Sequence, residues 1–137
     1  MQENAGHLGD LEPLWMTRAE DLAVGRDTLH AADLENRQTH EANHNAAALA
    51  MLLERFRVAR LDLVTQLESA DEADWERSAM HPRLQTRMRL LDHAFFVAEH
   101  DDHHLATITG LLRFTGQNWD ESQNLHPDER FITMVAT

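Results

Sequence analysis

The sequence contains no cysteine. This absence excludes a disulfide framework, a cysteine nucleophile and thiolate metal ligands. Any metal would therefore be held by nitrogen and oxygen atoms, which suit zinc, nickel, iron or manganese. Basic residues are also scarce. The sequence has 12 basic and 24 acidic residues, which gives a net charge of −12. Such a chain is expected to bind neither nucleic acid nor an anionic membrane surface, since both interactions rest on neutralising phosphate groups.

Several targeting and catalytic signals are absent as well. No apolar run is long enough to span a bilayer, and no signal peptide or lipidation motif is evident, which predicts a cytoplasmic protein. The sequence has no phosphate-binding loop, no Gly-Xaa-Ser-Xaa-Gly motif and no paired Glu-Xaa-Xaa-His motifs of a di-iron bundle. With 137 residues, the chain is expected to form a single domain over residues 1–137.

Apolar residues at helical spacing predict three long helices, over residues 2–24, 45–68 and 87–114. Pro13 lies inside the first of these patterns and lacks an N–H group, so it is expected to kink or divide that helix near Glu12. The order of a long helix, a long connection and two further long helices favours an all-α bundle.

The segments between these helices show weaker patterns. Residues 26–44 have little periodicity and predict a connection with at most one turn of helix. Ser69 and Glu72 resemble a capping box and predict a short helical turn, followed by a loop over residues 77–86. The tail over residues 117–137 has no helical period, and its one apolar stretch is expected to form a short strand or a packing arm.

The stretch that carries the chemistry reads His-Asp-Asp-His-His and begins at His100, inside the third predicted helix. His100 and His104 share one helix face, about 6 Å apart along the axis. The same face carries Phe96, so both rings point toward the core, where an unpaired polar ring is costly. The carboxylates between them, Asp101 and Asp102, are expected to be solvated rather than hydrogen-bonded to a ligand ring.

His7 occupies a similar position, because it heads the apolar stripe of the first predicted helix. Three imidazole ligands that leave coordination positions open are typical of catalytic metal sites. We therefore predict a mononuclear metal site formed by His7, His100 and His104. The alternative is that the pair in the third helix consists simply of two polar residues, which the spacing alone does not exclude.

The other histidines are weaker candidates. His93 lies about 10 Å along the axis from the nearer member of the pair and is expected to be a supporting or plain core residue. His93 and His103 are candidates for a general base by proximity only, and no residue is assigned a catalytic role. The histidines of the connecting segment are expected to be solvated polar residues rather than ligands: His30, His40 and His44.

Three stretches resemble the DinB-like (YfiT-like) superfamily. Gly-His-Leu-Gly-Asp-Leu-Glu-Pro-Leu-Trp at residues 6–15 resembles its second helix. Residues 90–105, which end in His-Asp-Asp-His-His-Leu, resemble its last helix. Asp-Trp-Glu and His-Pro within residues 74–82 resemble the segment between the two. The resemblance covers about residues 5–114.

This resemblance implies a four-helix bundle of up-down-down-up order, with a long crossover between its second and third helices that matches residues 26–44. It also implies a divalent metal such as nickel, zinc or iron, held by three histidines whose positions match His7, His100 and His104. Characterised relatives include bacillithiol and mycothiol S-transferases and a thiol-dependent maleylpyruvate isomerase. We therefore expect a metal-dependent thiol transferase or hydrolase that acts on a small molecule, with a low-molecular-weight thiol such as bacillithiol as cofactor.

The chain departs from the family pattern at its start. Family members have a helix before the one that carries the first histidine, whereas this sequence begins almost at His7. The groove left by that helix is expected to be covered by residues 131–135, by a second copy in a homodimer, or by residues of a longer natural chain. Residues 117–137 lie outside the family core. The departure favours a second hypothesis, a non-catalytic dimeric bundle whose metal site is structural or vacant.

Overall fold

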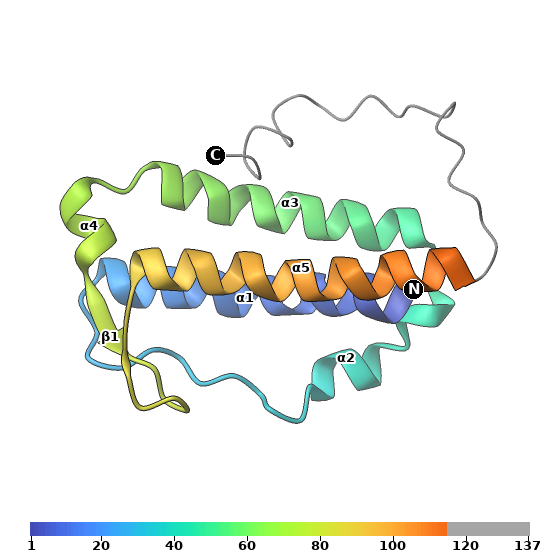
Figure 1. Ribbon diagram of the computed structural model, residues 1–137, viewed down its shortest axis with the longest axis horizontal. Coiled ribbons are helices and arrows are strands. Elements are labelled where there is room, and N and C mark those ends of the chain that lie inside the picture. Colours follow the sequence, from blue (N-terminus) through green and yellow to red (C-terminus); the bar gives the residue numbers. More distant parts are fainter. Residues whose placement is uncertain (115–137) are drawn as a thin grey trace.

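Three long helices form the body of the protein, whose computed structural model describes residues 1–114. These helices, α1 (Gln2–Ala23), α3 (Leu49–Glu68) and α5 (Leu90–Phe114), run side by side (Figure 1). α1 packs against both of the others. The predicted all-α fold is confirmed, whereas the predictions for residues 117–137 lie outside the described residues.

The helix directions follow the expected bundle. α1 and α3 run in the same direction and α5 runs back against them (Figure 1), which is the order of the last three helices of an up-down-down-up bundle. Two parallel neighbours need a long return connection, and residues 24–48 supply it along the length of α1. This crossover contains α2 (Arg37–Ala42) and a 3-10 turn, η1 (His44–Ala46). Two short helical segments therefore stand where at most one turn was predicted.

The crossover ends with changes of backbone direction that delay the start of α3. Asn43, before η1, has a left-handed φ of 49°, and Ala47, after it, is extended with φ −91° and ψ 151°. These conformations interrupt the helical pattern. α3 consequently begins at Leu49 rather than at residue 45 as predicted.

α1 continues as one helix through Pro13. Of the two expected effects of this proline, a kink or a division of the helix near Glu12, the division is wrong. A proline removes one backbone hydrogen bond, but the half of α1 that follows it is held by the core. Trp15, Ala19 and Leu22 are each at most 4% exposed, and their burial outweighs the lost hydrogen bond.

A capped helical turn follows α3. Ser69 is the C-cap residue of α3, and α4 (Glu72–Glu76) is capped by Asp71, whose carboxylate accepts a hydrogen bond from the amide of Asp74 at 2.8 Å. The predicted turn is confirmed. The predicted capping pair of Ser69 and Glu72 is wrong, because Asp71 and Asp74 form the capping box two residues further on.

A two-stranded hairpin occupies part of residues 77–86, which were predicted as a loop. β1 (Ser78–Met80) pairs antiparallel with β2 (Arg87–Arg89), with Ala79 opposite Met88. α5 consequently begins after β2 rather than at residue 87. Strands of three residues are too short to show an alternating apolar pattern, although the two facing residues at their centres are buried.

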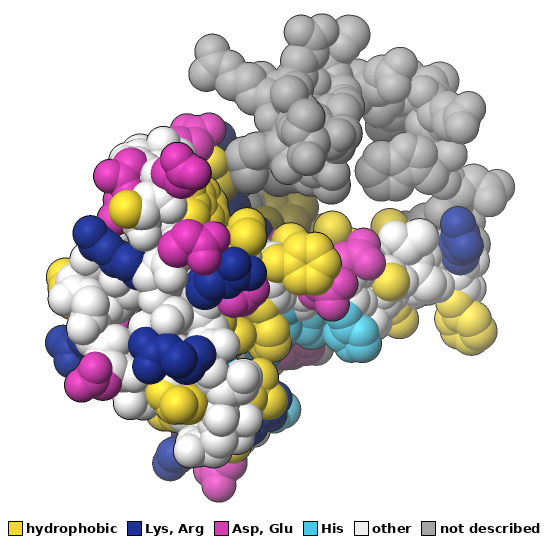
Figure 2. Space-filling view, turned by 60° about the vertical axis from the view of Figure 1, so that its left-hand side comes forward, with side chains coloured by type: hydrophobic (Ala, Val, Ile, Leu, Met, Phe, Trp, Pro, Cys, Tyr) yellow, Lys and Arg dark blue, Asp and Glu magenta, His cyan; other side chains and the backbone are white. Residues whose placement is uncertain are grey.

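The core lies where the three long helices and the hairpin meet. Its buried members are Trp15, Ala19, Leu22, Leu29, Leu63, Ala79, Met88, Leu90 and Val97. Other apolar side chains remain exposed, among them Leu61 of α3 at 57% and Phe95 of α5 at 66%. Figure 2 shows hydrophobic side chains open to solvent on one face, beside a group of histidines. None of the described helices is long and apolar enough to cross a membrane.

Candidate metal centre

Three histidines from two helices meet at one place. His7 lies near the start of α1, and His100 and His104 are one turn apart in α5. One nitrogen from each residue lies within 4.8 Å of the other two. The ring centroids are 4.7 Å apart for His100 and His104, and 4.8 Å apart for His7 and His104. The structure thus brings together the three residues that the sequence predicts as ligands.

A threonine of the crossover orients His7. Nδ1 of His7 lies 3.1 Å from Oγ1 of Thr39, and this hydroxyl donates its proton to Oδ2 of Asp10 at 2.9 Å. Because the hydroxyl proton is already used, Thr39 accepts from His7, so Nδ1 of His7 carries the ring proton. The lone pair of His7 is then on Nε2, the nitrogen left for a metal.

Asp10 is the centre of a buried network. Its side chain is 3% exposed, and Oδ2 also lies 2.7 Å from Nε2 of His44. Oδ1 accepts a hydrogen bond from Nη2 of Arg55 in α3 at 2.7 Å. A carboxylate satisfied by three partners holds the crossover and α3 against α1, next to His7.

His44 is therefore not the solvated residue that was predicted. It is 2% exposed, and its ring packs directly on Gly6 of α1. A Cβ atom at Gly6 would lie 2.2 Å from the ring of His44, so only glycine permits this approach. The sequence-based expectation was wrong because the partners of His44, Gly6 and Asp10, are more than 30 positions away in the chain.

His104 is oriented by a residue of α1. Nδ1 of His104 lies 2.9 Å from Oδ1 of Asn4. An amide oxygen accepts hydrogen bonds, so Nδ1 of His104 carries the proton and Nε2 keeps its lone pair. His7 and His104 thus have the same tautomer, set by different neighbours.

His100 supplies the observation that tests the fit of a metal. Its Nδ1 is buried and makes no hydrogen bond within residues 1–114. Oδ1 of Asp101 lies 3.7 Å away, which is too far for a hydrogen bond. A buried polar atom without a partner is costly, and three imidazoles form a nitrogen donor set suited to zinc or nickel. The residues present therefore fit a divalent metal.

Asp101 is engaged elsewhere. Its side chain is 14% exposed and pairs with Arg60 of α3, so the expectation that it is solvated is wrong. Arg60 also donates to Oε1 of Glu12 in α1 at 2.6 Å. This arginine therefore links the two helices that carry the histidines, and it helps to fix their relative position.

The protonation states of the cluster suit metal binding. Burial, followed by repulsion from His100 and His7, lowers the pKa of His104 to about 4. Burial, followed by repulsion from His100, also lowers the pKa of His7. Both rings are consequently neutral at pH 7, which is the form of imidazole that binds metal ions.

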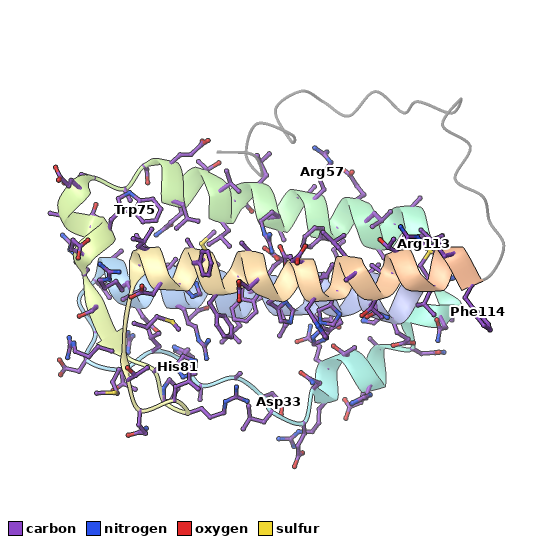
Figure 3. All side chains as sticks on the ribbon, viewed as in Figure 1. Asp33, Arg57, Trp75, His81, Arg113 and Phe114 are labelled. Atoms are coloured by element: carbon purple, nitrogen blue, oxygen red, sulfur yellow. The ribbon has the colours of Figure 1, made fainter. Side chains whose placement is uncertain are left out.

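A cavity of about 390 Å³ adjoins the cluster. It lies between α1, α5, the crossover and the segment that joins the two strands. Its lining comprises His7, Leu11, Leu14, Trp15, Arg18, Ala31, Ala32, Asp33, Leu34, Asn36, His81, Pro82, Arg83, Phe96 and His100. In Figure 3, His81 and Asp33 lie on the crossover side of the bundle, away from Arg57 on α3. Two of the three clustered histidines are therefore open to a space of small-molecule size.

The remaining histidines lie outside the cluster. His93 is fully buried, and its Nε2 donates to the backbone oxygen of Trp15 at 2.9 Å, which makes it a core residue. His103 is exposed, with its ring 5.5 Å from that of His104. His30 and His40 are exposed as expected. Neither His93 nor His103 is assigned the role of general base.

Comparison with known proteins gives one family. The family model described as the DinB superfamily matches residues 1–108. No curated protein and no solved structure matches the chain.

Proposed function

The chain belongs to the DinB superfamily, and on this basis we propose that it is a metal-dependent enzyme that joins a thiol, or water, to a small electrophilic molecule. His7, His100 and His104 would hold a divalent metal such as zinc, nickel or iron. A low-molecular-weight thiol such as bacillithiol would be the cosubstrate of a transferase. Water would replace it in a hydrolase.

The observation that carries this proposal is the position of the cluster at a cavity. His7 and His100 both line the cavity of about 390 Å³, so a molecule in this space can reach the ligand nitrogens. A structural metal is usually enclosed by four protein ligands, whereas a catalytic metal keeps a position open to substrate. Three histidines beside an accessible cavity favour the catalytic arrangement.

The metal and the protein residues would make different contributions to the reaction. When bound, a divalent metal lowers the pKa of a coordinated thiol or water and so supplies a nucleophile at neutral pH. The protein keeps the ring nitrogens of His7 and His104 in the correct tautomer through Thr39 and Asn4. Trp15 and the apolar residues of the cavity wall would contact the apolar part of a bound substrate.

The test is thiol consumption by the zinc- or nickel-loaded protein in the presence of a general electrophile such as 1-chloro-2,4-dinitrobenzene. In a transfer, the thiol loses its proton, sulfur bonds to the ring carbon and chloride leaves with the bonding electrons. We expect turnover above the uncatalysed rate for wild type and for His103→Ala, and none for His104→Ala. Equal rates for the loaded wild type and His104→Ala, across several thiols and electrophiles, would refute a catalytic metal site.

A second candidate is a non-catalytic bundle that forms homodimers. The exposed apolar side chains of α3 and α5, among them Leu61 and Phe95, favour association with a second copy. The solution mass measured by light scattering tests this alternative. A dimer that binds no metal after zinc or nickel is added would support it, and a monomer would exclude it.

A further inference from the structure

The cavity contains a buried arginine whose charge is not balanced by a close carboxylate. Arg18 of α1 is 2% exposed and lines the cavity. Its Nε donates to the backbone oxygen of His30 at 2.9 Å, and no ion pair of the described residues includes Arg18. Asp21 is the acidic group with the largest effect on it, but its two oxygens already bind Arg26 and His30. A buried cation of this kind would be stabilised by a further anionic partner.

Two further hydrogen-bond donors lie at the same end of the cavity. His81 is 4% exposed, and its Nδ1 accepts the backbone N–H groups of Arg83 and Leu84 at 3.3 and 3.1 Å. The ring proton is therefore on Nε2, which has no hydrogen-bond acceptor within residues 1–114 and can donate to a ligand. The amide of Leu29, next to His30, donates to the backbone oxygen of Met80, next to His81, at 3.0 Å, so the crossover brings Arg18 and His81 to the same region. Burial, followed by the positive charges of Arg18 and Arg83, lowers the pKa of His81. Arg83 also lines the cavity and belongs to no ion pair within residues 1–114.

Among the described residues, the one acidic member of the cavity lining does not neutralise these groups. Asp33 accepts hydrogen bonds from the backbone N–H groups of Glu35 and Arg37, both at 3.1 Å. Its carboxylate also lies 3.6 Å from Nε of Arg37. The Asp33 carboxylate is thus occupied by hydrogen bonds at the start of α2. The end of the cavity at Arg18 therefore keeps a positive charge.

An apolar wall connects this positive end with the histidine cluster. Cζ of Arg18 lies 5.7 Å from the ring centroid of Trp15, and the ring centroid of His100 lies 5.5 Å from that of the same indole. Leu11, Leu14 and Phe96 complete the wall. A single small molecule can therefore contact the guanidinium group and the cluster at the same time.

We propose that the end of the cavity formed by Arg18, His81 and Arg83 binds the carboxylate of a small organic acid, whose apolar body packs on Trp15 and extends toward the histidine cluster. This inference rests on the proposed function, because it names the substrate class of the same site. The guanidinium group suits this role, since its planar array of N–H groups matches the two oxygens of a carboxylate.

The test compares hexanoate with hexanamide, which share an apolar chain and differ in charge. Dissociation constants would be measured by ligand-observed NMR on the full chain, as purified and again with chelator present. We expect hexanoate to bind about tenfold more tightly than hexanamide under both conditions, which is the effect of one charge-assisted hydrogen bond. Equal affinities in wild type would overturn the proposal. A preference that disappears with chelator would also overturn it, because the carboxylate would then bind a metal ion.

Variants locate the carboxylate. Arg18→Gln should abolish the preference for hexanoate, with helical content checked by circular dichroism because the residue is buried. Arg83→Gln, at an exposed residue, should weaken the preference without disturbing the core. Arg57→Gln removes an equal charge from α3, on the side away from His81 (Figure 3), and should leave it unchanged. A preference that survives unaltered in both cavity variants would overturn the proposal.

These measurements are independent of the thiol reaction. If the protein prefers hexanoate but shows no turnover, the carboxylate site is supported and the proposed function is refuted. If the protein consumes thiol but binds hexanoate and hexanamide equally, the proposed function is supported and the carboxylate site is refuted.

Discussion

The hydroxyl of Thr39 lies 3.1 Å from Nδ1 of His7, so a residue of the crossover sets the tautomer of a cluster histidine that belongs to α1. The hydroxyl can only accept from the imidazole, because its own proton goes to Asp10 at 2.9 Å. Asp10 is in turn fixed by His44 and Arg55. The nitrogen of His7 that keeps its lone pair is thereby determined by contacts from three separate segments of the chain.

Thr39→Val should weaken zinc binding by about tenfold to a hundredfold, because residues that orient a ligand histidine commonly contribute this much to metal affinity. The isosteric side chain keeps the volume and removes the acceptor for His7. Zinc affinity would be measured by competition with a chromophoric chelator. Thr39→Ser should restore most of the affinity, and Thr109→Val, at an exposed position of α5, should leave it unchanged. Wild-type affinity in Thr39→Val would show that the hydroxyl does not orient the ligand.

His104→Ala should abolish stoichiometric metal binding, whereas His103→Ala, one position earlier and exposed, should retain about one ion per chain. The reason is that His104 contributes one of the three clustered nitrogens, while His103 lies outside the cluster. Metal content would be measured by plasma mass spectrometry on untagged protein purified without chelator and then supplied with zinc or nickel. Equal metal content in the two variants would refute the ligand assignment.

The parts of this site that were predicted from the sequence depend on periodicity within one helix. His100 and His104 share a face because they are four positions apart, and His7 was placed with them by its apolar stripe and by the family resemblance. The supporting residues could not be found in this way. Thr39 lies 32 positions from His7 in a segment without periodicity, and only the folded chain brings the two together.

The same limit applies to Asp101 and His44, whose burial depends on residues distant in the chain. Asp101 was expected to be solvated because its helix position points away from the stripe, yet Arg60, 41 positions earlier, pairs with it in the folded protein. His44 was expected to be solvated because residues 26–44 show no regular spacing of apolar residues. Its burial depends on Gly6 and Asp10, whose positions relative to it are set only when the crossover returns along α1.

The stability of the protein should fall as the pH decreases from about 6.5 to 4, and His93 should contribute to this loss. Burial lowers the pKa of His93 from 6.5 to about 4, so the unfolded chain binds a proton in this range that the folded protein does not. The stabilisation is present above pH 6.5 and is lost toward pH 4, by about 2 to 3 kcal/mol from this residue.

His93→Gln isolates this contribution, because glutamine can still donate to the backbone oxygen of Trp15 but does not titrate. Urea denaturation at pH 7 and pH 4.5 would give the free energies of unfolding. We expect the wild-type protein to lose about 2 to 3 kcal/mol more than the variant between these values. Since the carboxylates titrate in both proteins, they cancel in the comparison. Equal losses in the two proteins would contradict the assignment to His93.

Gly6→Ala should destabilise the protein, whereas Gly110→Ala should stabilise it. A Cβ atom at Gly6 would lie 2.2 Å from the ring of His44, so the crossover must move or its bond to Asp10 must break, at a cost of about 1 to 3 kcal/mol. No atom of residues 1–114 lies within 4 Å of the Cβ position at Gly110, in the exposed part of α5, where alanine gains about 1 kcal/mol of helix propensity. Urea denaturation measures both effects at pH 7.

Since the displaced crossover carries Thr39, Gly6→Ala should also weaken zinc binding, and Gly110→Ala should not. A stabilised Gly6→Ala protein with wild-type zinc affinity would show that the close packing of His44 on α1 is not what holds the crossover in place.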